Sequence, residues 1–202
     1  QINKPANNSS VGGLVSIEGS AYAVKNFRAY QVSVGAGLAP TTWSELRNSA
    51  QPVQGDVLAT WPTAGLPESA IYTIRLTAQD IEGGVSDAQV SVSIDNLAPA
   101  KPLGLQAQLS GSQDVSLKWA ANSEPDLAGY LLYRDGQLAN QIDPSDNSIA
   151  PYLLSATNYV DKARPDGTFV YTVVAVDKAN NQSIASDPAS VRVDNRAPQA
   201  VI

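Results

Sequence analysis

A short motif, Asp-Asn-x-Ala-Pro, occurs twice in this chain at the spacing of one small domain. It begins at Asp95 and again at Asp194, 99 residues further on. Each copy follows a run of alternating apolar and polar residues and ends in Pro, which cannot continue a central strand. Similarity at a fixed period indicates tandem units. The 202 residues therefore predict two modules, over 1–98 and 99–197, with 198–202 as a linker or the start of a following module.

Alternation of apolar and polar side chains supplies the secondary-structure signal in both modules. A period of two residues predicts half-buried strands, and turn signals such as Gly12-Gly13 and Asp135-Gly136 separate them. The predicted strands lie at 15–18, 30–34, 72–79, 90–94, 115–119, 131–133 and 190–194. A short helical turn is expected at 41–46. The expected fold class is all-β, as two tandem antiparallel β-sandwiches of the immunoglobulin-like or fibronectin type III-like kind.

Composition removes several classes of chemistry. The chain has no Cys and no His, which excludes disulfides, thiolate–zinc sites, cysteine nucleophiles and a Ser-His-Asp triad. A net charge of −6 argues against a nucleic-acid partner, and no apolar run is long enough for membrane insertion. We therefore predict no catalytic residue and no enzyme activity in this chain. The absence of Met and the first residue, Gln1, lead us to expect a piece of a longer protein.

The second module resembles a bacterial fibronectin type III domain over nearly its whole length. The resemblance rests on Val-Ser-Leu-Lys-Trp at 115–119, on Gly-Tyr-Leu-Leu-Tyr-Arg at 129–134 and on Phe-Val-Tyr-Thr-Val-Val-Ala-Val-Asp at 169–177. It implies that Trp119 is the core tryptophan of the second strand and that Tyr130 belongs to the third. It also implies that Tyr171 opens the sixth strand and makes the corner hydrogen bond of that fold.

The first module is similar to a divergent immunoglobulin-like domain. It has Tyr72 before an alternating strand, Asp80 at the end of that strand and the same closing motif. It departs from the family because its tryptophans, Trp43 and Trp61, come later than the second strand. Tandem modules of this appearance are found in large bacterial adhesins, proteases, polysaccharide-degrading enzymes and repeat-containing toxins.

Acidic and amide side chains near the strand ends leave one cofactor hypothesis open, a structural calcium ion. Carboxylate and amide oxygens are the ligands that calcium prefers. The candidate ligands are Asp80, Asp95 and Asn96 in the first module and Asp177, Asp194 and Asn195 in the second. Asp87 belongs with the first set and Asp187 with the second, and we expect each set to lie at one end of its module. The alternative is that Asp and Asn form turns there and that Pro stops the strand.

Two other clusters have a chemical and a structural interpretation. Trp43, Trp61 and Tyr152 would suit a sugar-stacking platform, but packing is the interpretation we favour because aromatic residues dominate the cores of small sandwiches. A glycoside hydrolase needs two facing carboxylates in a cleft. The candidates for such a pair are Glu124, Asp126, Asp143 and Asp146, with Asn147 beside the last two, and we expect them to be solvated loop residues.

These observations predict a non-catalytic spacer or interaction segment of a large bacterial protein that is secreted or displayed on the cell surface. Its expected partners are neighbouring domains of the same polypeptide, with a protein or glycan ligand as a further candidate. Two alternatives stay open. One is an adhesive ligand- or carbohydrate-binding module, because sandwich loops and edges are ready recognition surfaces. The other is an accessory or scaffold segment of a secreted hydrolase, protease or repeat-containing toxin.

Overall fold

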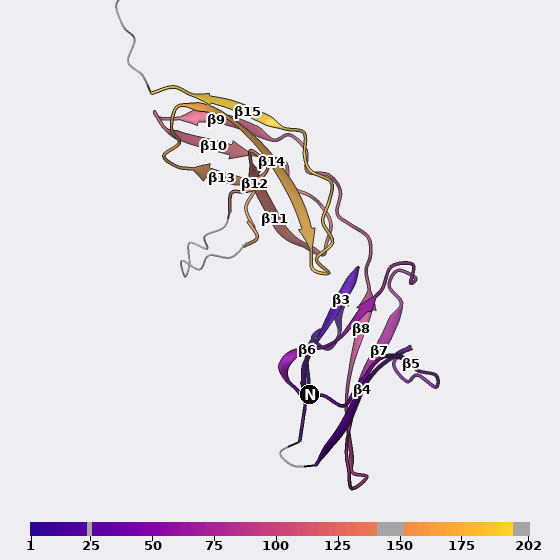
Figure 1. Ribbon diagram of the computed structural model, residues 1–202. Coiled ribbons are helices and arrows are strands. Elements are labelled where there is room, and N and C mark those ends of the chain that lie inside the picture. The colour runs from indigo at the N-terminus through magenta and orange to yellow at the C-terminus, as the bar shows by residue number, and fades with distance from the viewer. Residues whose placement is uncertain (24–25, 141–151, 196–202) are drawn as a thin grey trace, which may run out of the picture. The chain divides into compact units, whose positions relative to one another are not determined.

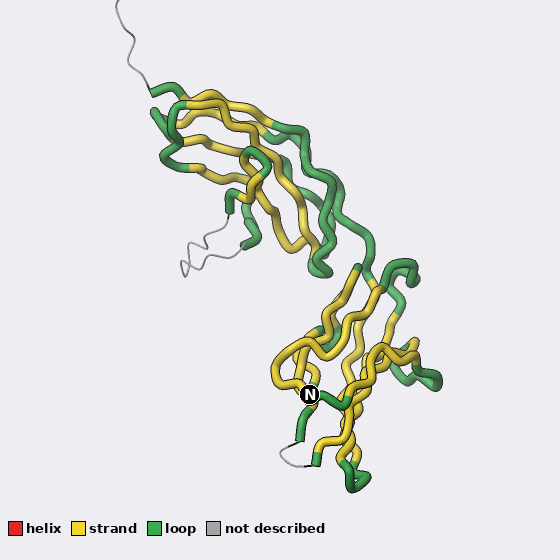
Figure 2. The backbone as a smooth tube through the Cα atoms, in the orientation of Figure 1, coloured by secondary structure: helices red, strands yellow, loops and turns green. Residues whose placement is uncertain are grey.

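The chain consists of strands, turns and loops arranged in two compact units, which we call the first unit (Gln1–Leu97) and the second unit (Ala98–Ile202). The computed structural model describes residues 1–23, 26–140 and 152–195. Figure 1 and Figure 2 show no helix in these ranges, so the all-β prediction is confirmed. None of the described residues forms a helix that could cross a bilayer. Residues 198–202 and the predicted loop residues Asp143, Asp146 and Asn147 lie outside the described residues.

Two sheets form the first unit. The smaller sheet has the order β1-β3-β6 and the larger has the order β2-β8-β7-β4-β5. Pairing is antiparallel throughout, except where β2 runs parallel to β8. The strands are β1 (Ile2–Lys4), β2 (Ser9–Val11), β3 (Leu14–Ala21), β4 (Phe27–Ala36), β5 (Ser44–Ser49), β6 (Val53–Pro62), β7 (Ile71–Asp80) and β8 (Val85–Ile94).

The first strand of this unit is split between the two sheets, which the sequence analysis did not predict. β1 pairs with β3 in the smaller sheet, and after Pro5 the chain crosses to the larger sheet. There β2 pairs with the end of β8, with Ser9 opposite Val92 and Val11 opposite Ile94. Each half is only three residues long, too short to show a periodic pattern in the sequence.

The predicted helical turn at 41–46 is wrong, because Ser44–Ser49 forms β5 at the edge of the larger sheet. Its backbone groups pair with β4, where Ser44 lies opposite Val34 and Glu45 opposite Ser33. The connection before β5 folds closely against Gly35. A Cβ atom on Gly35 would lie 2.7 Å from the carbonyl oxygen of Thr42, so this approach requires glycine.

The second unit has a three-stranded sheet, β13-β10-β9, and a four-stranded sheet, β12-β11-β14-β15. All its strand pairs are antiparallel. The strands are β9 (Gln106–Ser110), β10 (Asp114–Lys118), β11 (Leu127–Arg134), β12 (Gln137–Leu138), β13 (Asn158–Asp161), β14 (Gly167–Asp177) and β15 (Ala189–Val193). This arrangement of three strands facing four is that of the fibronectin type III sandwich.

Each unit encloses its own apolar core between its sheets. In the first unit the alternating positions predicted to face inward are buried, among them Ile17, Val32 and Ile74, which have no exposed surface. In the second unit Val115, Leu117 and Leu132 have the same role. Burial of such side chains contributes about 1.5–3 kcal/mol each relative to exposure, which accounts for the strict alternation in the sequence.

The continuous apolar run at 131–133 has a separate explanation. Leu132 faces the main core, while Leu131 packs on the opposite face of the four-stranded sheet with Val174 and Val176. Leu138 and Leu153 cover this second cluster. Because β11 is buried on both faces, its sequence loses the alternation of a half-buried strand.

Candidate functional site

Asn96 of the repeated motif connects two loops at the end of the first unit through side-chain hydrogen bonds. Asn96 accepts hydrogen bonds on its Oδ1 atom from the N–H of Gly13 and the hydroxyl of Thr63, both at 2.9 Å. Its Nδ2 group donates to the carbonyl oxygen of Thr63 at 3.0 Å. The side chain thus bridges two loops, the one between β2 and β3 and the one after β6. This structural task explains why an amide follows Asp95 here.

The N–H of the motif asparagine donates to a carboxylate in both units. In the first unit, the N–H of Asn96 lies 3.0 and 3.1 Å from the two carboxylate oxygens of Glu68, three residues before β7. In the second, the N–H of Asn195 donates to Asp166 Oδ1 at 2.8 Å, directly before β14. Glu68 and Asp166 were not among the residues predicted from the sequence. Their shared position just ahead of equivalent strands was the available signal.

Asp80 and Asp177 are turn residues at the ends of β7 and β14. Asp80 Oδ1 accepts the N–H groups of Glu82 and Gly84, at 2.9 and 2.7 Å. Asp177 Oδ1 accepts those of Ala179 and Asn181, at 2.8 and 2.9 Å. Both carboxylates therefore bond the backbone two and four residues ahead, as aspartate does when it closes a turn.

The structure does not bring the calcium candidates of either unit together. Asp80 lies beside the start of β8, whereas Asp95 follows its last residue. Asp194 lies beside Gly167 at the start of β14, whereas Asp177 ends that strand. A strand of ten or eleven residues spans about 30 Å, so the expectation that each set gathers at one end is wrong.

The remaining candidates have partners within their own units. Asp95 Oδ1 accepts the N–H of Leu97 at 3.2 Å, and Asp194 pairs with Arg192 at 3.1 Å. Asp187 pairs with Lys101 at 2.6 Å. Calcium binding by any of these side chains stays a prediction, and the hydrogen bonds give each position a structural explanation that needs no ion.

Tyr171 is the centre of a buried polar network in the second unit. The side chain has no exposed surface, and its hydroxyl donates to Asp161 Oδ2 at 2.8 Å. The same carboxylate pairs with Arg134 at 2.7 Å and with Arg164 at 3.3 Å. Burial, and then the hydrogen bond to Asp161, raise the pKa of the Tyr171 hydroxyl above its ordinary value.

This network differs in two ways from the tyrosine corner that the fibronectin type III resemblance implied for Tyr171. Tyr171 lies in the middle of β14, which begins at Gly167, so it does not open the strand. Its acceptor is a side-chain carboxylate on β13, whereas the corner of the related domains uses a backbone group. The charged acceptor is satisfied by the two arginines, which allows a carboxylate to be buried here.

Each core contains one tryptophan that meets a tyrosine edge-on. Trp119 and Tyr130 have ring centroids 5.5 Å apart at 73° in the second unit. Trp61 and Tyr72 lie 5.3 Å apart at 60° in the first. Trp61 is on β6, where it pairs with Val15 of β3, so the first unit takes its tryptophan from the strand next to the expected one.

Two of the three proposed sugar-stacking aromatics, Trp61 and Tyr152, pack in or against the cores of their units. Trp61 is only 4% exposed, which leaves no ring face for a ligand. The Arg75 guanidinium lies 3.9 Å from the centroid of the Trp43 ring and covers that face. Tyr152 is half-buried against the core of the second unit. The packing interpretation of Trp61 therefore holds, and Trp43 is a partly covered surface ring.

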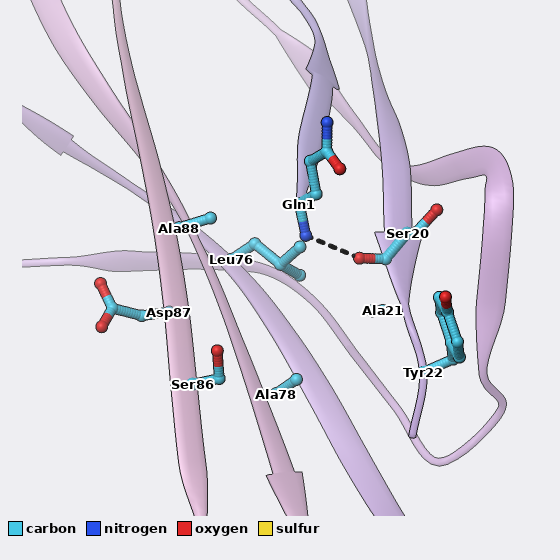
Figure 3. A pocket seen from close by; sticks show the side chains of 9 residues that line it. All are labelled: Gln1, Ser20, Ala21, Tyr22, Leu76, Ala78, Ser86, Asp87 and Ala88. Atoms are coloured by element: carbon cyan, nitrogen blue, oxygen red, sulfur yellow. Dashed lines mark hydrogen bonds between the residues drawn. The ribbon is translucent and has the colours of Figure 1, made fainter. Parts of the chain in front are cut away.

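An open hollow of about 330 Å³ lies in the first unit between β3 and the β7–β8 pair. Figure 3 shows Leu76, Ala78 and Ala88 on one side, with Gln1 and Ala21 on the other. Asp87 is the one carboxylate of this lining, and its side chain points away from the others. The hollow therefore lacks the pair of facing carboxylates that glycoside hydrolysis uses.

Glu124 and Asn122, in the loop before β11, hold the first residues of the second unit. Glu124 Oε1 accepts the N–H of Ala100 at 2.6 Å, and Asn122 Nδ2 donates to the Ala100 carbonyl oxygen at 2.8 Å. The hydrogen bond from Ala100 is the main reason that the pKa of Glu124 is lowered. Asn122 is itself fixed because its N–H donates to the buried Tyr130 hydroxyl at 2.8 Å. Glu124 is thus a structural carboxylate.

Comparison with known sequences finds segments of larger bacterial enzymes. The chain is 30% identical over 177 residues to Exoglucanase B of Cellulomonas fimi, which covers 82% of this chain and 15% of that protein. It is 27% identical over 138 residues to Chitinase A1 of Niallia circulans, with 64% and 18% covered. The chain thus spans less than a fifth of the length of either relative. No protein-family model matches it.

Solved structures show the same fold. Fibronectin(III)-like modules of Clostridium thermocellum CbhA superpose with a TM-score of 0.57 at 15% identity, covering 100% of this chain and 98% of that one. The FN1-FN3 domains of chicken CNTN1 give a TM-score of 0.66 at 16% identity, covering 94% and 68%. Together with the three-on-four strand arrangement of the second unit, these likenesses establish that the chain has the fold of fibronectin type III-like and immunoglobulin-like β-sandwich modules.

Proposed function

We propose that this chain is a non-catalytic spacer segment of a secreted bacterial enzyme that degrades a polysaccharide. One observation carries the proposal: the similarity to Exoglucanase B covers 82% of this chain but 15% of that enzyme. The similar part is therefore a segment of a much larger polypeptide, and the same relation holds for Chitinase A1. Such a segment would act by setting the distance and orientation of neighbouring domains.

The contacts of the polar side chains support a structural task. Asp80 and Asp177 close turns, Asn96 bridges loops, and Asp161 is neutralised by arginines. Catalysis requires groups positioned around a reacting atom in a cleft, and these side chains are instead bonded to backbone groups and side chains of their own unit. Trp61 is buried in the core, which weighs against the alternative of a sugar-stacking module.

The proposal implies particular partners and a location. The partners are the other domains of the same polypeptide, and the location is outside the cell, where enzymes named as exoglucanase and chitinase meet polymeric substrates. Spacer action requires no cofactor. It does require stable units, because a mechanical separator acts only while it is folded.

Two measurements on the isolated chain and its parent test this proposal. Incubated with cellulose and with chitin, the isolated chain should release no reducing sugar. In the parent enzyme, replacement of this segment by an unrelated pair of β-sandwiches with a short linker should leave the activity on insoluble substrate unchanged. Deletion of the segment should lower that activity. Sugar release by the isolated chain, or a parent that is not a secreted polysaccharide-degrading enzyme, would overturn the proposal.

A further inference from the structure

We propose that the joint between the two units is stiffened by two carboxylate latches, one at the end of the first unit and one at the start of the second. The outgoing latch is Glu68 on Asn96, and the incoming latch is Glu124 with Asn122 on Ala100. Between the latched residues the chain has only Leu97, Ala98 and Pro99. The inference deepens the proposed spacer function and rests on it for its biological meaning.

The outgoing latch fixes the backbone where the chain leaves the first unit. The N–H of Asn96 lies within 3.1 Å of both carboxylate oxygens of Glu68, and its side chain is held by Gly13 and Thr63. Hydrogen bonds to a charged acceptor are about twice as strong as neutral ones. Asn96 is therefore part of the folded unit even though it follows the last residue of β8 by two positions.

The incoming latch fixes the backbone where the chain enters the second unit. Both backbone polar groups of Ala100 are bonded, its N–H to Glu124 and its carbonyl oxygen to Asn122. Asn122 in turn donates its N–H to the buried hydroxyl of Tyr130, which ties the latch to the core. The next residue, Lys101, pairs with Asp187 at 2.6 Å. The chain thus joins the fold of the second unit at Ala100.

The three residues between the latches have little freedom of their own. Proline fixes its φ angle near −65°, so Pro99 cannot act as a swivel about that bond. The residue before a proline is restricted to extended conformations, which limits Ala98. The N–H of Leu97 donates to Asp95 Oδ1 at 3.2 Å. Few backbone dihedral angles of the joint can therefore rotate freely. The two latches also restrain the backbone of Asn96 and Ala100 on either side of it.

The same outgoing latch occurs in the second unit. Asp166 accepts the N–H of Asn195 at 2.8 Å, at the position equivalent to that of Glu68 and Asn96. Both copies of the motif thus bond to a carboxylate that lies just before equivalent strands, although the acid differs in type and in distance from the strand. This recurrence supports the interpretation that the carboxylate fixes the backbone where the chain leaves a unit.

The test compares the alignment of the two units in solution. Residual dipolar couplings of the full 202-residue chain give one alignment tensor for each unit. We expect the wild-type tensors to agree in magnitude and the double variant Glu68→Ala, Glu124→Ala to lose that agreement, with each unit still folded by its amide spectrum. Asp166→Ala is the matched control, because it breaks an equivalent latch away from this joint and should leave the two tensors in agreement.

A second pair of variants keeps the test decisive. Insertion of Gly-Ser between Ala98 and Pro99 should uncouple the tensors and shows the response of a loose joint. Glu124→Gln retains an acceptor oxygen and should preserve more of the agreement than Glu124→Ala. Wild-type tensors that already differ, or a double variant that keeps them equal while the insertion uncouples them, would overturn the inference. These measurements use the isolated chain, so they can reject the stiff joint while the parent-enzyme test still supports the spacer function. The parent-enzyme test can likewise reject the spacer function while these measurements support the stiff joint.

Discussion

Replacement of Tyr171 by Phe removes one hydroxyl from the buried network of the second unit and leaves the ring in place. The hydroxyl has no exposed surface and donates to the carboxylate of Asp161 at 2.8 Å. A hydrogen bond to a charged group contributes about 1.5–3 kcal/mol to stability. A loss of about 2 kcal/mol lowers the melting temperature of a domain of this size by roughly 8–16 °C.

Tyr30 offers a matched control in the first unit. Its side chain is as completely buried, but its hydroxyl donates at 2.9 Å to a neutral acceptor, the carbonyl oxygen of Leu58. Tyr30→Phe should therefore cost about 1 kcal/mol, and only in the first unit. The comparison isolates the charge of the acceptor, because both substitutions delete a buried phenol hydroxyl.

Urea unfolding followed by two-dimensional NMR separates the units, because amide signals of β14 and β4 report on one unit each. We expect Tyr171→Phe to shift the midpoint of the second unit and to leave that of the first unchanged. If Tyr171→Phe costs no more than Tyr30→Phe, the reasoning from the charged acceptor is refuted.

Three further predictions concern stability. Burial, and then the hydrogen bond to Asp161, raise the pKa of Tyr171, so its contribution to the free energy of unfolding is present below about pH 10 and is lost as the pH rises above it. The difference in free energy of unfolding between wild type and Tyr171→Phe should therefore narrow in urea titrations taken from pH 8 to pH 11. A difference that stays constant over this range would contradict the linkage. Trp119→Ala empties a site that is 3% exposed and should destabilise the second unit by about 3–5 kcal/mol, measured by urea unfolding, with an unchanged midpoint as the contrary result. Asn96→Ala removes the bridge to Gly13 and Thr63 and should cost the first unit about 1–3 kcal/mol by calorimetry, whereas an equal loss in both units would count against a local role.

The sequence predicted the features that depend on local periodicity. Alternation around Ile74 and Leu117 identified strands and their buried faces, because a half-buried strand must repeat every two residues. The repeated Asp-Asn-x-Ala-Pro motif indicated tandem units, since it ends equivalent last strands. These signals are carried by neighbouring residues, so they can be read without knowledge of strand order.

Features that depend on pairing between distant strands were not predicted. Asp161 is ten residues from Tyr171 and on a strand of the other sheet, and nothing in the local sequence marks it as the acceptor. Asp80 and Asp95 were expected to meet because both flank strands, but a strand has two ends, and the sequence does not say which ends of neighbouring strands coincide. The same limit concealed Glu68, whose partner Asn96 lies 28 residues away.

The central claim is that this chain is a spacer inside a larger secreted enzyme, and recovery of that polypeptide tests it most directly. An antibody raised against residues 1–202 would be used to isolate the native protein from culture medium, and mass spectrometry would give its full sequence. The account predicts a larger secreted protein that carries a polysaccharide-hydrolysing domain in the same polypeptide. A native protein without such a domain, or one retained inside the cell, would contradict it.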